Sequence, residues 1–350
     1  MVYVICYLEI IFGYLFVKSK FISLKQYCIF TSVFFIGIVG LRNIYLGITD
    51  TSIVYIPRFN NIYHYGWDYT VSIDKDMGFQ IVTYIFTKLF GNNEILYLII
   101  MGAPYIISVS FLIYKYSKHP MLSFIVFLSL NYFSLGFTIM RQVIAMSILM
   151  VSFHYIIKRK KWKFILSVLL ASLFHKVSII FLIVYPISKL QFRKIYLGVI
   201  PLCLGCAILL PNTVKQMMLY FFKDDTRWSG HITNAITLNL TNFMICLMFV
   251  IIGIIYLRSI IKDRINVILL YMSILASSFA PFSIIIRELG RVSYIFGIFN
   301  IILLPNILMT EKNYTTRNIM ILVACYIFII YFFCFLGVDV NILPYKFYWQ

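Results

Sequence analysis

Acidic side chains are scarce in this sequence of 350 residues. Only 12 Asp and Glu stand against 30 Lys and Arg, and charged residues of both signs make up 12% of the chain. Soluble domains carry about 25% charged residues, so this composition excludes a soluble globular fold. Hydrophobic residues reach 62%, and apolar runs near the roughly 20 residues that cross a bilayer recur throughout. The sequence predicts a polytopic membrane protein with a single transmembrane domain over residues 1–350.

The sequence also lacks the patterns of a disulfide framework, a metal site and a cleaved leader. Its seven cysteines are odd in number and lie in apolar segments, and Cys203 and Cys206 have no second Cys or His pair to complete a zinc site. No dense carboxylate cluster indicates a metal, and we expect no cofactor. The first apolar run has no basic leader or small-residue cleavage site, which predicts a retained first span.

The net charge of +18 is not arranged as a nucleic-acid-binding patch, so no nucleic acid partner is expected. Eighteen of the 30 Lys and Arg recur in short clusters between apolar runs, with only Asp263 and Glu311 among them. The positive-inside rule makes these clusters cytoplasmic. The clusters are Lys18/Lys20/Lys25, Lys115/Lys118, Lys158/Arg159/Lys160/Lys161/Lys163, Lys189/Arg193/Lys194, Arg258/Lys262/Arg264 and Lys312/Arg317. The opposite face contains nine acidic residues, and chemistry is expected there.

This assignment predicts an all-α fold with about twelve transmembrane helices and both termini outside. Outer loops are expected at 42–93, with interfacial helices, and at 211–235. The predicted spans are 2–17, 26–41, 94–114, 119–135, 138–157, 164–174, 177–188, 196–210, 236–257, 265–282, 292–309 and 318–336.

Two segments resist a simple hydropathy reading. Residues 77–90 would form a helix only about 21 Å long, so they are predicted to lie along or dip into the outer interface. If residues 164–188 formed one span, every later loop would lie on the opposite side of the membrane from the side that its charge predicts. The alternative is a re-entrant or broken pair of short helices that meet at His175 and Lys176, which requires protein or a water-filled cavity beside the break.

Arg141 lies in an apolar run, where a guanidinium costs about 2.5 to 3.5 kcal/mol at a helix centre. It precedes Lys158 by 17 residues, or about 25 Å of helix, so it is expected near the outer edge of the hydrocarbon. One interpretation is an Arg that reaches lipid headgroups. The other is a phosphate or pyrophosphate ligand, because the planar guanidinium donates two parallel hydrogen bonds. Further cations on that face are Arg42, Arg287 and Arg291, with Glu288 among them and His175 at the hairpin tip.

The outer loop that begins near Leu41 is rich in Tyr, Trp, Asn and Asp. Aromatic faces stack on sugar rings and polar side chains bond hydroxyls, so a carbohydrate surface is one hypothesis. An interfacial aromatic belt explains the same residues. The candidate sugar-binding residues are Tyr55, Trp67, Asp68 and Glu288. Residues 221–239 repeat this composition and are interpreted either as a lid or as a plain exposed loop.

Four segments together resemble the EpsG family of membrane polysaccharide polymerases, which is related in role to Wzy-type O-antigen polymerases. The resemblance covers roughly residues 40–300. The segments read "LRNIYLGITDTSIVY", "DKDMGFQIVTYIF", "IMRQVIAMSILMVSFHYIIKRKKWKFILSVLLASLFHKVSIIFLIVYPI" and "IRELGRVSYIF". Lys176 departs from the pattern by placing an extra cation beside His175.

The resemblance implies a C-type glycosyltransferase fold at the outer face of the bacterial inner membrane. Such an enzyme moves a glycan from undecaprenyl pyrophosphate onto the terminal sugar of another carrier-linked repeat unit. The resemblance then implies that Arg141, Arg287 and Arg291 bind the departing pyrophosphate, with Arg42 as a further candidate. Membrane lipids and a chain-length regulator are candidate partners.

The attacking hydroxyl needs a base, and His175 and Asp50 are the two candidates. An imidazole with a pKa near 6.5 is better poised than an unshifted Asp, which favours His175. Three alternative functions stay open at this point: a lipid-linked oligosaccharide flippase, a membrane acyltransferase, and a ligase that transfers finished glycan. A flippase is expected to have central charges and internal repeats, neither of which is evident. The sugars, the linkage, the anomeric outcome and the oligomeric state do not follow from the sequence.

Overall fold

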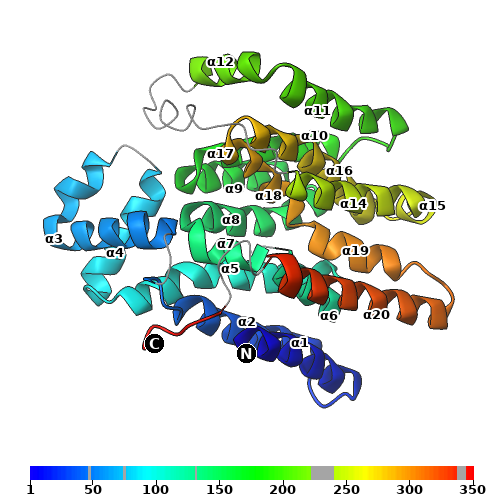
Figure 1. Ribbon diagram of the computed structural model, residues 1–350, viewed down its shortest axis with the longest axis horizontal. Coiled ribbons are helices and arrows are strands. Elements are labelled where there is room, and N and C mark those ends of the chain that lie inside the picture. Colours follow the sequence, from blue (N-terminus) through cyan, green and yellow to red (C-terminus); the bar gives the residue numbers. More distant parts are fainter. Residues whose placement is uncertain (46–48, 74–75, 131, 222–239, 337–343) are drawn as a thin grey trace. The chain divides into compact units, whose positions relative to one another are not determined.

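The computed structural model describes the chain apart from residues 46–48, 74–75, 131, 222–239 and 337–343 (Figure 1). The described residues form helices, with one isolated antiparallel bridge between Arg42 and Phe347. A single transmembrane domain was expected, and the residue contacts divide the chain into two units. Unit 1 comprises Met1–Leu182 with Glu311–Gln350, and unit 2 comprises Ile183–Thr310. Each unit is described by itself.

Unit 1 contains most of the long apolar helices. Its elements are α1 (Val2–Lys18), α2 (Leu24–Gly40), the π-helical turn η1 (Thr51–Tyr55), α3 (Ile56–Ser72), α4 (Met77–Phe90), α5 (Glu94–Tyr116), α6 (Pro120–Ser129), α7 (Tyr132–Thr138), α8 (Met140–Ile157), α9 (Lys161–Phe174), the 3-10 helix η2 (Lys176–Ile183), α20 (Tyr314–Tyr331) and η5 (Phe332–Leu336). Side-chain caps begin several of them. Asn93 caps α5, Asn313 caps α20, and Ser23 with Gln26 forms a capping box for α2.

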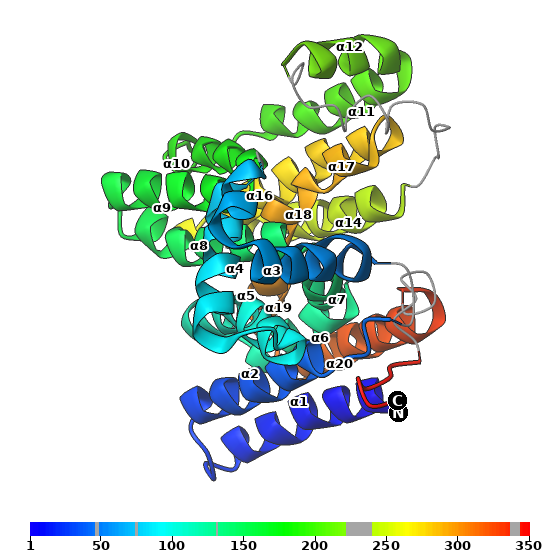
Figure 2. The same cartoon turned by 90° about the vertical axis from the view of Figure 1, so that its left-hand side faces the viewer.

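Helices α5, α8 and α9 lie side by side in both ribbon views (Figures 1 and 2). The turn between α8 and α9 runs through Lys158–Lys160, where Arg159 takes a positive φ of 55° and lets the chain reverse tightly. Phe153 on α8 and Phe164 on α9 are fully buried. The α8–α9 pair is therefore an antiparallel hairpin whose free ends are the start of α8 and the end of α9.

The chain reverses again at His175. Backbone φ and ψ there are −156° and 106°, so the residue is extended and α9 stops at Phe174. The rings of Phe164 and Phe181 lie 6.0 Å apart. In one continuous helix, 17 residues of separation would place them about 25 Å apart. The predicted break at His175 and Lys176, with two short helices folded back on each other, is therefore confirmed.

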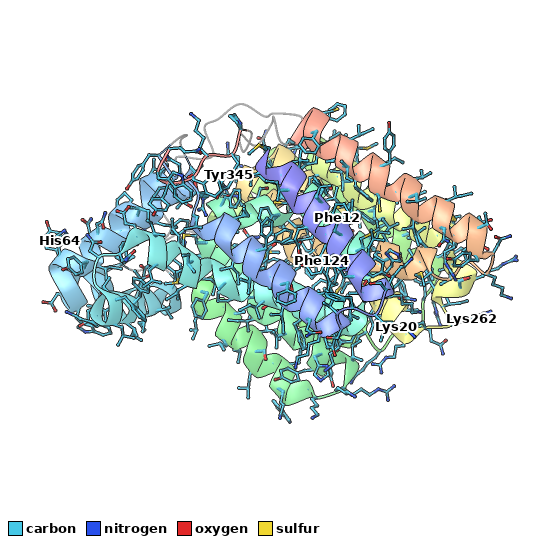
Figure 3. The ribbon with its side chains drawn as sticks, turned by 90° about the horizontal axis from the view of Figure 1, so that it is seen from below. Phe12, Lys20, His64, Phe124, Lys262 and Tyr345 are labelled. Atoms are coloured by element: carbon cyan, nitrogen blue, oxygen red, sulfur yellow. The ribbon has the colours of Figure 1, made fainter. Side chains whose placement is uncertain are left out.

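Helices α3 and α4 pack on each other at one end of α8 and α9 (Figure 1). Pro57 suits the first turn of α3, and Gly66 with φ of 70° kinks the same helix. Seen from below, His64 lies at the tip of this pair, at the opposite end of unit 1 from Lys20 on the α1–α2 turn (Figure 3). The segment 42–93, predicted to contain interfacial helices, thus contains two helices, and their place in a bilayer stays a prediction.

The carboxyl-terminal segment closes over the start of α1 and the end of α2. Tyr345 packs its ring 6.0 Å from that of Tyr3 and donates a hydrogen bond to the carbonyl of Ile38 at 2.7 Å (Figure 3). The backbone of Tyr348 donates to the carbonyl of Leu41 at 2.9 Å. These contacts fix the backbone that leads into Arg42.

Unit 2 is held together by polar pairs within an apolar interior. Asn306 donates to Asn266 at 3.1 Å and Asn242 donates to Ser293 at 2.6 Å. Its elements are α10 (Val184–Ile187), η3 (Lys194–Gly198), α11 (Val199–Leu209), α12 (Pro211–Phe221), α14 (Thr241–Ile255), α15 (Leu257–Ile260), α16 (Arg264–Phe279), η4 (Ala280–Ile284), α17 (Arg287–Gly290), α18 (Val292–Gly297) and α19 (Asn300–Leu308). The predicted outer loop 211–235 begins with α12, and its remainder falls largely outside the described residues.

Helices occupy all twelve predicted span positions, but length sets a lower count of crossings. Among the described residues, four helices are long and apolar enough to cross a membrane, and six if two bent pairs each count as one span. The four are α5, α8, α16 with η4, and α20 with η5. Five further apolar helices are shorter, including α2 and α14. The chain is therefore an all-helical membrane protein, while twelve crossings and a C-type glycosyltransferase fold stay predictions.

Candidate functional site

Arg141 stands in the first turn of α8 with two polar partners. Its Nη1 donates to the carboxylate of Asp76 in an ion pair, and its Nε donates to the hydroxyl of Tyr55 at 3.3 Å. The guanidinium carbon also lies 5.6 Å from the centre of the Tyr55 ring, a cation–π distance. The side chains of Arg141 and Asp76 are 16% and 10% exposed. The positive charge of Arg141 in the apolar helix α8 is thus neutralised by the Asp76 carboxylate, and the Tyr55 hydroxyl provides a further hydrogen bond.

Asp76 is held in place by the start of α4. It occupies the N-cap position with a left-handed backbone, φ of 50° and ψ of 53°, and its carbonyl accepts from the amide of Phe79 at 2.9 Å. A non-glycine residue in this region costs on the order of 1 kcal/mol, and Asp is among the residues that tolerate it. The side chain caps no backbone amide of its own helix, so the carboxylate serves Arg141.

The start of α4 lies against the end of α9. A Cβ atom on Gly78 would come within 3.0 Å of both the Cβ and the carbonyl oxygen of Leu173. Only glycine permits this approach without displacement of one helix. Leu173 is two residues before His175, so the Asp76 carboxylate and the hairpin tip belong to one region of unit 1.

Tyr55 ends the π-helical turn and is buried, with 3% of its surface exposed. Its ring centre lies 5.5 Å from that of Phe79. It belongs to an apolar cluster that fixes the phenol beneath Arg141. The cluster comprises Ile44, Tyr55, Ile56, Phe59, Phe79, Phe86, Tyr97, Leu98, Met101, Met140 and Ile144, and Phe174 packs against it.

His175 lies at the same end of the α8–α9 hairpin as Arg141. Arg141 is 17 residues before Lys158, and His175 is 15 residues after Lys160, which correspond to about 25 Å and about 22 Å of antiparallel helix. The two neighbours Met140 and Phe174 meet in the same apolar cluster. His175 is half-buried, and its carbonyl accepts from the amide of Ser178 at 2.9 Å.

The other end of these helices is basic. The hydroxyl of Tyr116, at the end of α5, and Nδ1 of His154, near the end of α8, are 2.7 Å apart, which places the two helix ends level. Lys115 on α5 and Lys158 and Lys160 after α8 surround this contact. Unit 1 therefore has a cationic end and, about 25 Å away along α8, an end with the Arg141–Asp76 pair.

A family model supplies the identification. The EpsG family model matches residues 25–347, nearly the whole chain. The chain belongs to the EpsG family. This is a family of Wzy-like polymerases, and the recognition made from four sequence segments is confirmed. No curated protein and no solved structure shows a significant match to the chain.

In this EpsG protein Arg42 is buried and bound to backbone. Its Nη1 donates to the carbonyl of Val39, and its Nη2 donates to the carbonyl of Phe137 at 2.8 Å and to Thr51 at 3.2 Å. Phe137 is four residues before Arg141. Arg42 therefore fastens the entry to α8, with three of its five donors already engaged.

Asp50 directly precedes the π-helical turn that joins Thr51, beside Arg42, to Tyr55, beside Arg141. It is half-buried. Single π-helical turns occur often at functional sites. The turn links the two arginines through five residues.

The candidate sugar-binding residues separate into two groups. Trp67 is 47% exposed, with its ring 5.2 Å from that of Tyr84, and Asp68 is exposed beside it. Tyr55, by contrast, lies beneath Arg141 rather than on a surface. The assignment of Trp67 and Asp68 to sugars stays a prediction.

Arg287, Glu288 and Arg291 belong to unit 2 and therefore carry no measured relation to Arg141. Arg287 and Glu288 open the single turn α17, and only their backbone is described. Arg291 is half-buried at the N-cap of α18. Their predicted convergence with Arg141 stays a prediction.

Two contacts of the EpsG site were not anticipated. Nothing in the motif "DKDMG" predicts a partner for Asp76, which is one of the nine acidic residues expected on the outer face. Glu94 accepts from Tyr45 at 2.7 Å and from Asn60 at 3.0 Å, which ties α3 to the start of α5. This hydrogen bond raises the pKa of Tyr45 to about 12, because it stabilises the neutral phenol.

Proposed function

We propose that this EpsG protein is a polysaccharide polymerase, a glycosyltransferase that uses a lipid pyrophosphate donor. It transfers a growing glycan from undecaprenyl pyrophosphate onto the terminal sugar of another carrier-linked repeat unit. The reaction takes place at the outer face of the bacterial inner membrane. Family membership supports the polymerase class, and the residues of the Arg141 end support the chemistry.

The reaction breaks the bond between the anomeric carbon of the donor glycan and a phosphate oxygen. A bond forms between that carbon and the acceptor hydroxyl oxygen, and the hydroxyl proton passes to a base. The leaving undecaprenyl pyrophosphate keeps the bonding electrons, so negative charge grows on its oxygens. Arg141 is assigned to that charge, since a guanidinium fixed before the reaction stabilises it without reorganisation.

His175 is assigned as the base, with Asp50 as the alternative. An imidazole is neutral and ready to accept a proton near neutral pH. The level of His175 on the hairpin, about 3 Å from that of Arg141 along the helix axes, supports this assignment. Arg42 is assigned a positioning role, because its donors hold the backbone before α8.

The remaining cations and the surface residues complete the proposal. Arg287 and Arg291 contribute further charge for the pyrophosphate. Trp67 and Asp68, with Glu288, bind the sugars of donor and acceptor. Candidate partners are undecaprenyl-pyrophosphate-linked oligosaccharides, membrane lipids and a chain-length regulator.

One observation carries the proposal: an arginine in a membrane helix is oriented by a carboxylate and a phenol at the end remote from the basic turn. An isolated Arg that merely reached headgroups would need neither partner. The arrangement instead fixes one edge of the guanidinium and leaves another edge for a ligand.

The proposal is tested by the glycan profile of cells that depend on this protein for surface polysaccharide. Arg141→Ala and His175→Ala are expected to insert in the membrane and, at matched protein levels, to leave single repeat units in place of long chains. Tyr65→Ala, at an exposed position on α3, serves as the control and is expected to keep long chains. Full-length polymer in both site variants would refute the assignment.

A further inference from the structure

The guanidinium of Arg141 is only partly engaged. Its Nε bonds to Tyr55 at 3.3 Å and its Nη1 bonds to Asp76. Within the described part of the chain, Nη2 meets no hydrogen-bond acceptor. Both hydrogens on this atom are therefore available to a ligand that reaches the side chain.

The phenol of Tyr55 is also partly engaged. Its oxygen accepts from Arg141, and among the residues that the structure describes its own hydrogen meets no acceptor. Tyr55 is 3% exposed, so this hydrogen is poorly placed to bond bulk water. A buried donor without an acceptor is unfavourable, and an incoming anion that accepts from it removes that cost.

Stereochemistry decides where a phosphoryl group binds. A guanidinium has two edges that can each donate two parallel hydrogen bonds: the edge formed by Nε and Nη2, and the edge formed by Nη1 and Nη2. On the second edge, Nη1 is bound to the charged carboxylate of Asp76. On the first edge, Nε is bound to a neutral hydroxyl at 3.3 Å, near the long limit for such a bond. A phosphoryl oxygen therefore displaces the Tyr55 hydroxyl more easily than the Asp76 carboxylate.

We propose that Tyr55 is a ligand for the diphosphate of the lipid-linked donor. Two phosphoryl oxygens accept hydrogen bonds from Nε and Nη2 of Arg141. The Tyr55 hydroxyl changes from acceptor to donor and bonds one of these oxygens. Asp76 stays on Nη1 and keeps the guanidinium in its plane. This inference rests on the proposed function, because that function supplies the diphosphate.

The packing of Tyr55 separates this role from sugar binding. The centre of its ring lies 5.5 Å from that of Phe79 and 5.6 Å from the guanidinium carbon of Arg141. The ring thus has protein neighbours where a stacked sugar would lie. Its hydroxyl, in contrast, meets Arg141, whose guanidinium is only partly engaged.

Titration calorimetry on the full chain in phosphatidylcholine nanodiscs tests the inference. Inorganic pyrophosphate and farnesyl diphosphate are the probes. Tyr55→Phe is expected to weaken both about 10- to 100-fold, since it removes one hydrogen bond to a charged ligand. Tyr63→Phe, an exposed tyrosine on α3, is the matched control and is expected to bind as the unchanged protein. Equal affinity in Tyr55→Phe and in the control would overturn the inference.

A second variant keeps the test decisive if Tyr55→Phe folds poorly. Replacement of Tyr55 by 3-fluorotyrosine makes the phenol a stronger donor with little change in shape, so tighter diphosphate binding is expected. Weaker or unchanged binding would contradict a donor role. Nanodiscs that contain phosphatidylglycerol form a further arm: loss of diphosphate binding there would show that the site takes lipid headgroup phosphate and would overturn the donor assignment.

The two proposals fail separately. If Tyr55→Phe weakens pyrophosphate binding but the unchanged protein makes no polymer, the polymerase assignment fails and the anion site stands. If the protein makes polymer while Tyr55→Phe binds pyrophosphate normally, only the role of Tyr55 fails.

Discussion

At the scale of single residues, the account depends on how Asp76 and Arg141 share one charge pair. Either group alone in a mostly buried setting carries a desolvation cost that its partner offsets. Asp76 also has a left-handed backbone conformation, so a strained backbone and a buried ion pair occur at the same residue. This arrangement indicates that the conformation of Asp76 serves to orient the guanidinium of Arg141.

The coupling of this pair is measurable by a double-mutant cycle. Arg141→Gln and Asp76→Asn each leave one charge without its partner, and each is expected to destabilise the protein by on the order of 2 kcal/mol. The double variant removes both charges and is expected to cost clearly less than the sum. Thermal unfolding of the three variants in detergent measures the coupling. Additive effects would mean that the ion pair contributes nothing.

Sequence reasoning placed Arg141 and His175 at the same end of the α8–α9 hairpin but did not find their neighbours. The rise per residue of a helix gives the distance of each residue from the basic turn near Lys158. Asp76 lies 65 residues before Arg141, and a loop acid on the same face suits any outer cation, so its partner did not follow from charge. Tyr55 is predicted from the sequence as a sugar-binding residue, because the composition of the loop does not reveal that Tyr55 is buried against Phe79.

At the scale of elements, the close approach of α4 to α9 sets the position of Asp76. Gly78 is the contact point, with Leu173 opposite it. A longer side chain there pushes the first turn of α4 away from α9 by a few tenths of an ångström or more. Asp76 then moves relative to Arg141 and to the hairpin tip.

Gly78→Ala tests this arrangement. Overpacking against Leu173 is expected to cost about 1 to 3 kcal/mol and to lower polymer formation. Gly37→Ala is the matched control, because no atom lies within 4 Å of its added Cβ, and it is expected to be neutral or about 1 kcal/mol stabilising. Unfolding midpoints and glycan length are the two measurements. Equal behaviour of the two variants would remove the role given to the α4–α9 contact.

At the scale of the whole molecule, helix positions followed from hydropathy, while the twelve crossings stay a prediction. Apolar runs marked where helices form, including the break at His175, because hydrophobic length and charge act locally. A crossing also depends on tilt, bends and neighbours, and helices such as α2 and α14 are shorter than a full span. The predicted convergence of Arg141 with Arg291 stays a prediction, because the two residues belong to different units.

Sidedness is open to a direct check by cysteine labelling from outside the cell. In a background without native cysteines, Trp67→Cys on exposed α3 is expected to react with an impermeant maleimide. Lys160→Cys on the basic turn is expected to react only after the membrane is opened. The positive-inside rule gives both expectations. Reaction of Lys160→Cys in intact cells would show that the topology is the reverse of the predicted one.

The most direct measurement of the central claim is a reaction of the purified protein with defined undecaprenyl-pyrophosphate-linked repeat units. The account predicts a ladder of longer lipid-linked glycans, with one undecaprenyl pyrophosphate released for each linkage formed, and neither product with Arg141→Ala. Release of the carrier without growth of the glycan, or growth that is unchanged in Arg141→Ala, would contradict it.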